Sequence, residues 1–319
     1  MKADNFFLNV LIVNYNTWED TIECIESIGK SNYKKMRIFI VDNNSKDGSV
    51  EKIGNWVSRN KKFKLIKSNI KSFDVDWKNL DSFLNYTPLI IYSSSENLGF
   101  AKANNLYLQK FIESTSNEFL LMLNPDTVLF PNTINELVKS YDRDIQEIVG
   151  LKIKDYESDK VIVTGGYNYN SLTGSIKPNL MNKNYNLSYI HGGAVFLDSK
   201  TLKRVGLLPT DYFLYFEDHD WCYNALRKNI RLSVCSSAVC KDKVGTSIGR
   251  GFMSQYYYTF NVLLFSKKYF KVKMPFVIIY QFFRVIYFFT LKKNFDAGRG
   301  IIRGLYDYIA YGKRKIKIS

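Results

Sequence analysis

Acidic residues crowd one short stretch of the chain in a way that could support proton transfer. Glu217, Asp218 and Asp220 lie within four positions, directly after the aromatic run 212–216 and before a predicted helix. Crowded carboxylates repel one another unless a cation, a hydrogen-bond donor or a proton is near, so one of them can be held as a general base. A helix N-terminus also favours acidic residues through its dipole, but that reading does not account for the aromatic run.

A second candidate is the carboxylate in the stretch FLLMLNPDTVLF, residues 119–130. Five apolar residues predict a buried strand, and the polar residues Asn124, Pro125 and Asp126 follow it at once. Pro125 restricts the backbone, so the strand would hold Asp126 rigidly at its end.

Four polar clusters, including this one, follow predicted strands. They are residues 14–17, 42–45, 96–105 and 124–126. Ligands of parallel α/β sheets bind at the carboxyl ends of strands, so the shared position of the clusters indicates a binding site. Each cluster taken alone is also typical of turns and helix caps. The glycine-containing turn within 96–105 opens a helix and could present N–H groups to a phosphate.

The elements that would position these residues follow an α/β pattern. A strand and a helix alternate twice in about the first fifty residues, with Ile22, Ile25 and Ile28 on the inner face of the first helix. A third strand is followed by residues 68–87, which have no clear period and are interpreted as an insertion. A fourth strand, a helix to about residue 115 and the strand before Asn124 come next. From residue 149 the periods indicate an antiparallel extension, so the fold class is α/β with a mostly parallel central sheet flanked by helices.

The composition supports a globular protein with a strongly basic balance. The chain has 319 residues, 46% of them hydrophobic, and a formal net charge of +15. Residues 252–319 carry 13 Lys or Arg against two Asp, so this segment accounts for +11 of the charge. Such a charge suits nucleic acid, an anionic membrane or phosphorylated substrates. Four cysteines without CxxC pairing predict neither a zinc site nor a disulfide framework, and the start of the chain shows no signal peptide, so a cytosolic location is expected.

The segment 274–291 is almost wholly apolar or aromatic, with basic residues at both ends and Gln281 and Arg284 inside it. It is short for a membrane span, which usually needs roughly 20 apolar residues, and it carries a charge near its middle. We favour an interfacial helix with snorkelling cations. A helix docked on the rest of the chain and a true span stay open.

Six motifs in order give the chain a resemblance to a known family. They are VNYNT, VDNNSKDGS, ENLGFAKANN, LNPDTV, GGAVFLDSKTLKRVGLL and YFLYFEDHDWCYNAL, within residues 9–249. Together they resemble the inverting family 2 glycosyltransferases with the GT-A fold, in their rhamnosyltransferase-like branch. The resemblance implies a catalytic domain over 1–250, with a nucleotide-binding half at about 1–130 and an acceptor-binding half at about 131–250. Residues 251–319 would form a helical, membrane-associating or docking extension.

The resemblance also implies the roles of individual residues. Asp218 would be the catalytic base, with Glu217 orienting the loop or the acceptor, and His219 is expected to be exposed. Asp126 would bind a divalent metal, Mn²⁺ or Mg²⁺, on the diphosphate of the donor. The implied nucleotide-sugar-binding residues are Asn14, Tyr15, Asn16, Asp42, Asn44, Asn97, Gly99, Asn105, Asn124, Gly192 and Gly193.

Two positions depart from the family pattern. Many relatives have Asp where Asn124 stands, and they often have a metal-binding His at the position of Asp242. Asp242 is an acceptable oxygen ligand and would restore the charge missing at Asn124. A salt bridge from Asp242 to Lys241 or Lys243 is the alternative interpretation.

The expected function is transfer of a sugar from dTDP-rhamnose or a UDP-sugar to a glycan or lipid-linked glycan. The expected setting is synthesis of a bacterial surface polysaccharide, such as O-antigen or capsule, at the inner face of the cell membrane. Residues 252–319 would contact the membrane surface; nucleic acid is not an expected partner, and the oligomeric state stays open. A catalytically degenerate relative that binds membranes or nucleic acid is the alternative. Nucleotidyl transfer would require a Gly-rich, Lys-bearing phosphate loop, and VNYNT is not one.

Overall fold

The computed structural model describes residues 6–70, 86–114, 118–180, 187–243 and 251–311. Most of the predicted insertion at 68–87 therefore lies outside the described residues. The third strand extends to Ile70, and the fourth begins at Thr87.

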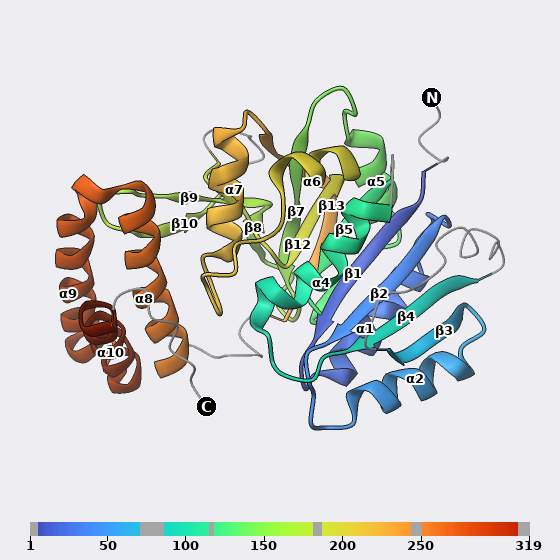
Figure 1. Cartoon of the computed structure of the whole chain (residues 1–319), viewed down its shortest axis with the longest axis horizontal. Coiled ribbons are helices and arrows are strands. Elements are labelled where there is room, and N and C mark those ends of the chain that lie inside the picture. The colour runs from blue at the N-terminus through green and yellow to red at the C-terminus, as the bar shows by residue number, and fades with distance from the viewer. Residues whose placement is uncertain (1–5, 71–85, 115–117, 181–186, 244–250, 312–319) are drawn as a thin grey trace.

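The N-terminal half is a parallel sheet in which strands alternate with helices, as predicted (Figure 1). The strand order is β3-β4-β2-β1-β5, and every neighbouring pair is parallel. The elements are β1 (Leu8–Asn14), α1 (Trp18–Gly29), β2 (Met36–Asp42), α2 (Ser49–Arg59), β3 (Phe63–Ile70), β4 (Thr87–Ser93), α4 (Gly99–Ser114) and β5 (Phe119–Leu123).

The second half continues the sheet with mixed strand directions. Strand β12 is antiparallel to both β5 and β7, whereas β13 is parallel to β7 and antiparallel to β6. The elements are β6 (Thr127–Leu129), α5 (Thr133–Ser140), β7 (Glu147–Asp155), β8 (Val161–Thr164), β12 (Ala194–Asp198), α6 (Ser199–Val205), α7 (Glu217–Arg227) and β13 (Arg231–Asp242). A small second sheet joins β9 (Gly166–Tyr169), β10 (Ile176–Pro178) and β11 (Tyr189–Ile190).

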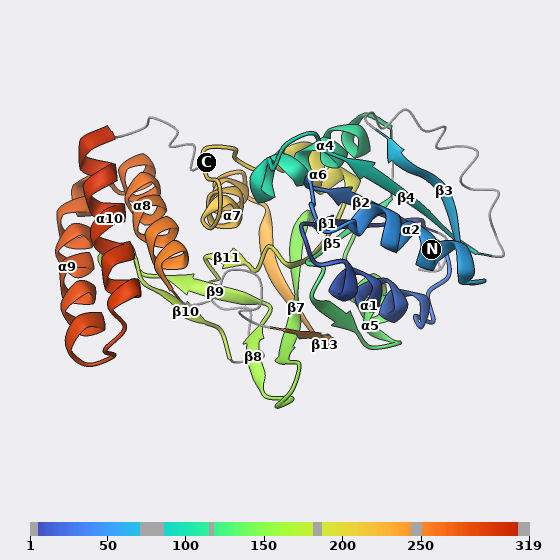
Figure 2. The same cartoon turned by 90° about the horizontal axis from the view of Figure 1, so that it is seen from below.

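Helices cover both faces of the main sheet. One hydrophobic core lies between the sheet and α1, α2 and α5, and another lies between the sheet and α4, α6 and α7. Figure 2 shows α1 and α5 on one side of the sheet and α4 and α6 on the other. Burial on both faces explains why β5 is continuously apolar: all five of its residues are buried.

The register of the parallel strands brings the predicted polar clusters to one edge of the sheet. Asn14 at the end of β1 pairs with Asp42 at the end of β2, and Asp42 pairs in turn with Ser93 of β4. Strand β5 runs parallel to β1 and ends at Leu123, directly before Asn124. The prediction that the clusters follow strand ends is confirmed.

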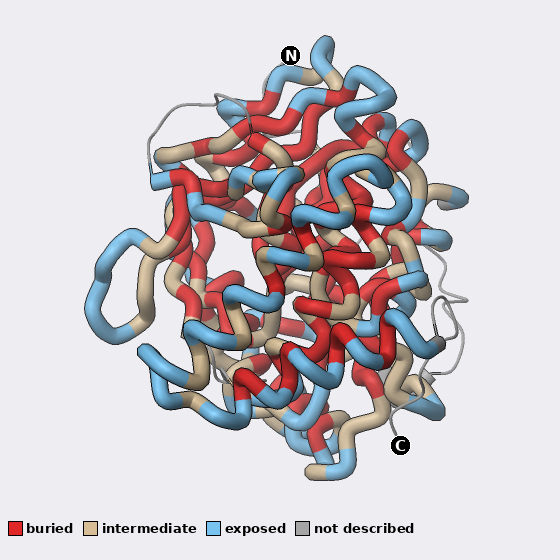
Figure 3. Tube along the Cα trace, turned by 90° about the vertical axis from the view of Figure 1, so that its left-hand side faces the viewer, coloured by how far each residue is buried: buried red, intermediate tan, exposed pale blue. Residues whose placement is uncertain are grey.

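The C-terminal residues form a helical unit with a third hydrophobic core. Its helices are α8 (Phe252–Tyr269), the short 3-10 helix η2 (Lys271–Lys273), α9 (Met274–Thr290) and α10 (Phe295–Tyr311). Figure 3 views the molecule from the side on which these helices lie, with exposed and buried positions distinguished by colour. Among the described residues, one helix, Lys271–Thr290, is long and apolar enough by length and composition to cross a membrane.

Arg284 of helix α9 does not point towards solvent as predicted. Its inner face buries Val277 and Gln281, and Arg284 also points inward, donating hydrogen bonds to Gln281 and to Gln255 of α8. The prediction of a snorkelling cation is therefore wrong for Arg284, because buried amide oxygens bind its guanidinium. The outer face exposes only apolar and aromatic large residues among those described: Phe276, Ile279, Phe282, Phe283, Ile286 and Tyr287.

Candidate active site

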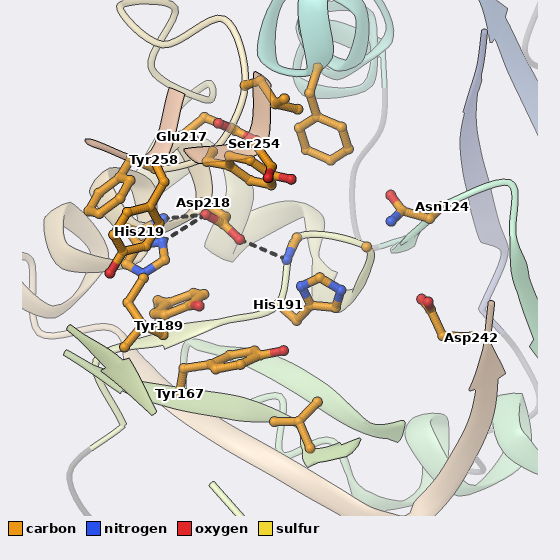
Figure 4. A pocket seen from close by; sticks show the side chains of 18 of the residues that line it. Asn124, Tyr167, Tyr189, His191, Glu217, Asp218, His219, Asp242, Ser254 and Tyr258 are labelled. Carbon is orange, nitrogen blue, oxygen red and sulfur yellow. Dashed lines mark hydrogen bonds and ion pairs between the residues drawn. The ribbon is translucent and has the colours of Figure 1, made fainter. Parts of the chain in front are cut away.

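The predicted catalytic and metal-binding residues line one cavity of about 530 Å³ (Figure 4). They come from distant parts of the chain: the turn after β5, the turn before β12, the start of α7 and the end of β13. The predicted residues in its wall are Asn124, Asp126, Gly192, Gly193, Glu217, Asp218 and Asp242.

A pair of acidic residues, Asp126 and Asp242, lies in one part of this cavity. Strand β6 pairs with the end of β13, and the register sets Asp242 opposite Thr127, next to Asp126. Burial, followed by the charge of Asp126, raises the pKa of Asp242 to about 7. Two carboxylates held this close are stabilised by a divalent cation.

The alternative interpretation of Asp242 as a salt-bridge partner of its neighbours is wrong. Lys241 pairs with Asp159 at 3.2 Å, and Lys243 pairs with Asp20 at 2.7 Å and Glu23 at 2.6 Å. Both lysines extend away from Asp242 because successive strand residues point to opposite faces.

The donor set fits a cation that shares its coordination with a substrate. The described residues contain no group of three or more His, Cys, Asp or Glu suited to a metal, and in the described part of the cavity wall Asp126 and Asp242 are the paired carboxylates. Mg²⁺ is usually bound through one or two carboxylates together with substrate phosphates and water. Asp126 and Asp242 match that pattern, and a structural zinc site would need more protein ligands.

The turn His191-Gly192-Gly193 contacts Asn124 on one side of the cavity and Asp218 on the other. On one side the Asn124 N–H donates to the carbonyl of Gly193 at 2.9 Å, and a Cβ added at Gly193 would lie 2.4 Å from the Asn124 amide nitrogen. On the other side the Gly192 N–H donates to Asp218 at 3.1 Å, and a Cβ added at Gly192 would lie 3.2 Å from the Cβ of Asp218. Only glycines allow this double approach.

The environment of Asp218 favours its ionised form. Burial by itself would raise the pKa of Asp218, but hydrogen bonding from His219, the charges of His219 and His191 and the Gly192 N–H outweigh it, and the pKa lies below its usual range. The His219 backbone N–H donates at 2.8 Å and its ring Nδ1 lies 3.0 Å from the same carboxylate oxygen. The Asp218 side chain keeps 16% of its surface exposed, so a substrate hydroxyl can reach it.

Glu217 has the opposite protonation preference. Burial and the neighbouring Asp218 raise its pKa well above the usual value. Its Oε2 is buried and has no hydrogen-bond partner among the described residues. The pKa values of the pair are therefore shifted in opposite directions, a division typical of acid–base sites.

Helix α8 supports the backbone that presents this pair. Tyr215 and Phe216, directly before Glu217, have φ of 64° and 74°, a left-handed conformation that costs energy for bulky residues. Asn261 of α8 donates to the carbonyls of Leu214 at 2.7 Å and Tyr215 at 3.0 Å. These bonds stabilise the turn.

The predicted nucleotide-binding residues of β1 and β2 lie at the sheet edge but outside the cavity wall. Asn14 is fully buried and donates to Asp42 at 2.7 Å, and Asp42 also accepts from the Ser45 N–H at 3.0 Å. Asn14 thus ties the two strand ends together. Tyr15 is 45% exposed beside them, and Asn16 and Asn44 adopt positive φ in the two turns.

The third polar cluster separates into two roles. The Asn97 side chain accepts from Asn43 at 2.9 Å and from the Gly99 N–H at 3.0 Å, and Gly99 has a φ of 74° at the start of α4. Asn105 differs from the prediction: its amide donates to the Leu208 carbonyl at 2.8 Å and accepts from the Leu208 N–H at 3.0 Å. Both polar groups of its side chain hold the loop before α7, and Asn105 does not line the cavity.

Several cavity residues were missed or misjudged from the sequence. His219 is buried, 5% exposed, and stacks on Phe216, so the expectation that it is exposed is wrong. His191, which directly precedes the motif GGAVFLDSKTLKRVGLL, also lines the cavity. The cavity-lining residues of α8 could not be identified from the sequence, because the composition of this segment is that of any aromatic helix. The additional polar and aromatic lining residues are Phe100, Tyr167, Tyr189, His191, Tyr215, Phe216, Ser254, Gln255 and Tyr258.

The opposite pKa shifts predict that Glu217→Gln stabilises the protein increasingly as pH rises. A group whose folded pKa is raised contributes stability below its unfolded pKa and loses it as pH rises toward the folded pKa. The glutamine variant has no charge to bury, so the difference in its favour should be larger at pH 8 than at pH 5. Thermal unfolding of both proteins at the two pH values measures it. Asp218→Asn is the matched control: the pKa of Asp218 is lowered from the ordinary 3.8, so its difference from the unaltered protein should be the same at pH 5 and pH 8. Equal differences at both pH values for Glu217→Gln would contradict a raised pKa of Glu217.

Residues 9–73 match the family model described as glycosyl transferase family 2. A curated relative, the low-salt glycan biosynthesis hexosyltransferase Agl10 of Haloferax volcanii, is 26% identical over 148 residues, which cover 44% of this chain. The chain spans about half of that relative's length, since the match covers 48% of it.

Solved structures share the fold at low sequence identity. The mannosyltransferase PcManGT from Pyrobaculum calidifontis, in complex with GDP-Man and Mn²⁺, has a TM-score of 0.57 at 13% identity, covering 96% of this chain and 88% of its own. S. aureus TarS 1–349 in complex with UDP-GlcNAc has a TM-score of 0.55 at 18% identity, covering 95% and 81%. The family match and the shared fold together support a family 2 glycosyltransferase with the GT-A fold.

Proposed function

We propose that this chain is an inverting glycosyltransferase that moves a sugar from a nucleotide diphosphate to an acceptor hydroxyl. The observation that carries the proposal is the presence, in one cavity, of an ionised Asp218 and the Asp126–Asp242 pair. The first suits a base and the second suits a cation on a diphosphate. A degenerate binding protein has no need to keep a base held by three hydrogen bonds from His219 and Gly192.

Asp218 would accept the proton of the acceptor hydroxyl. The acceptor oxygen then forms a bond to the anomeric carbon while the bond from that carbon to the diphosphate oxygen breaks, and the electron pair leaves with the diphosphate. The His219 ring directs its Nδ1 proton at Asp218, because the carboxylate can only accept. This contact fixes the orientation of the base.

Asp126 and Asp242 would hold the divalent cation, Mn²⁺ or Mg²⁺, beside the donor. When bound, such a cation neutralises charge that develops on a leaving diphosphate. Asn124 contributes no charge, so in this proposal Asp242 supplies the second one. Asn124 instead packs on Gly193 and sets the distance between the turn and the pair.

The donor and the biological setting extend the proposal. The two solved relatives bind GDP-Man and UDP-GlcNAc respectively, which supports a nucleotide sugar as the donor class. We place the chain in the rhamnosyltransferase-like branch on its motifs, with dTDP-rhamnose or a UDP-sugar as donor and a surface polysaccharide as product. Residues 1–130 would bind the nucleotide and 131–250 the acceptor, with α8 adding to the acceptor side.

The C-terminal unit would bring the enzyme to the inner face of the cell membrane. The exposed face of α9 carries Phe282 at 55% and Phe283 at 63% exposure, and its ends carry lysines such as Lys273 and Lys292. Apolar side chains flanked by cations suit the interface of an anionic bilayer. This arrangement supports a lipid-linked acceptor.

Asp218→Asn should lower turnover at least about 100-fold while leaving donor binding unchanged, because general-base help is typically worth about 10² to 10⁴ in rate. Release of nucleotide diphosphate from a panel of UDP-, dTDP- and GDP-sugars with Mn²⁺ measures it. Asp211→Asn, which changes an exposed carboxylate of the same loop, is the control. Near-normal turnover of the Asp218 variant would remove this residue from the role.

Asp242→Asn should weaken Mn²⁺-dependent binding of the preferred nucleotide diphosphate at least about tenfold. Loss of a residue that only supports a metal ligand already lowers metal affinity about 10- to 100-fold. Calorimetric titration with and without EDTA gives the affinities. Lys241→Met, at the neighbouring position, should leave them unchanged. Equal affinities for the Asp242 variant and the unaltered protein would place the cation elsewhere.

Phe283→Glu in α9 should abolish flotation of the full chain with phosphatidylglycerol vesicles at low salt, because it puts a charge in the apolar face. Leu180→Glu, at a 62% exposed position far from α9 in the chain, should float normally. If the unaltered protein ignores such vesicles, the membrane proposal is wrong.

A further inference from the structure

The acceptor side of the cavity is bounded by the C-terminal helix α8. In Figure 4, Asn124 and Asp242 lie on one side, whereas Asp218 and His219 lie on the other, beside Ser254 and Tyr258. A base must come within hydrogen-bond reach of the hydroxyl whose proton it takes. The ring that carries this hydroxyl therefore has to occupy the space between Asp218 and α8.

Gln255 of α8 lines this space with its amide oriented by a cation. Arg284 of α9 donates to the Gln255 side-chain oxygen. A guanidinium has no acceptor, so the oxygen of the amide must face it and the NH₂ group is directed away. Within the described residues that NH₂ group has no hydrogen-bond partner, which leaves its two N–H donors available to a molecule in the cavity.

Arg284 is itself fixed by three contacts. Besides Gln255, its guanidinium donates to the fully buried Gln281 at 2.5 Å and lies 4.5 Å from the ring centroid of Tyr258. The Tyr258 hydroxyl donates to the Gly174 carbonyl at 2.8 Å, so this side chain serves the cavity as a wall and not as a donor. The Arg284 guanidinium thus holds Gln255 and Tyr258 in place.

We infer that Gln255 and Tyr258 form the subsite for the acceptor sugar, with Gln255 donating to one of its oxygens and Arg284 acting as the positioning residue. The inference rests on the proposed function and names a hexose-bearing molecule as the ligand. Its ring has hydroxyl oxygens for the amide and apolar C–H faces for the aromatic walls. Those walls are Phe100, Tyr167, Tyr215 and Tyr258.

Gln255→Glu separates this role from a structural one. The carboxylate keeps the contact with Arg284, and its shape is nearly that of the amide, but it lacks both donors. Binding of octyl glucoside, galactoside, mannoside and rhamnoside is measured by saturation-transfer NMR with Mn²⁺ and UDP, dTDP or GDP present. We expect Gln255→Glu to weaken the bound hexoside at least about fivefold, with nucleotide binding and thermal unfolding unchanged.

The positioning role of Arg284 is tested by a double-mutant cycle. Arg284→Met should weaken hexoside binding, and Gln255→Leu with Arg284→Met should be no weaker than Gln255→Leu alone, since Arg284 acts through Gln255. Arg299→Met, an exposed arginine of α10, is the control.

Two results would overturn the inference. One is full hexoside affinity in Gln255→Glu, and the other is a protein that binds a nucleotide with Mn²⁺ but none of the four hexosides. A protein that neither binds nor hydrolyses any nucleotide sugar would instead refute the proposed function itself.

Discussion

The distance between Asn124 and Asp218 across the cavity depends on the close packing of the turn Gly192-Gly193. Gly193 touches Asn124 and Gly192 touches Asp218, so the turn acts as a spacer of fixed thickness between the metal side and the base. Any side chain at either position would move one of them. If Asp218 is the base, as proposed, a displacement of about 1 Å from the reacting hydroxyl would cost much of its effect. The strand β12, buried at every residue, holds the turn in place.

Burial gives the neighbouring acids different properties. Glu217 and Asp218 are adjacent in the chain, yet hydrogen bonds from His219 and Gly192 lower the pKa of Asp218, whereas burial and the charge of Asp218 raise that of Glu217. Glu217 is 6% exposed, and this burial disfavours its charged form. Burial and the charge of Asp126 likewise raise the pKa of Asp242, and this repulsion is what supports the proposed cation between the two carboxylates.

The C-terminal helices connect the site with the surface of the molecule. Helix α8 holds the strained turn through Asn261 and lines the cavity through Gln255. Helix α9 sets Gln255 through Arg284 and presents Phe282 and Phe283 outward. An acceptor held at a membrane by its lipid and an enzyme held there by α9 would therefore meet with the acceptor sugar next to α8.

The sequence alone determined the α/β class and the strand ends that carry polar clusters, because periodicity and turn chemistry are local properties of the chain. The resemblance of its motifs to a family then singled out Asp126, Asp218 and Asp242 as candidates. Only the tertiary structure decided the directions of side chains: Asn105 faces the Leu208 loop, His219 is buried under Asp218, and Arg284 points inward to α8. These outcomes depend on which elements pack together. A helix can turn the same residue to solvent, to a core or to a site, and its neighbours in space, not in sequence, decide which.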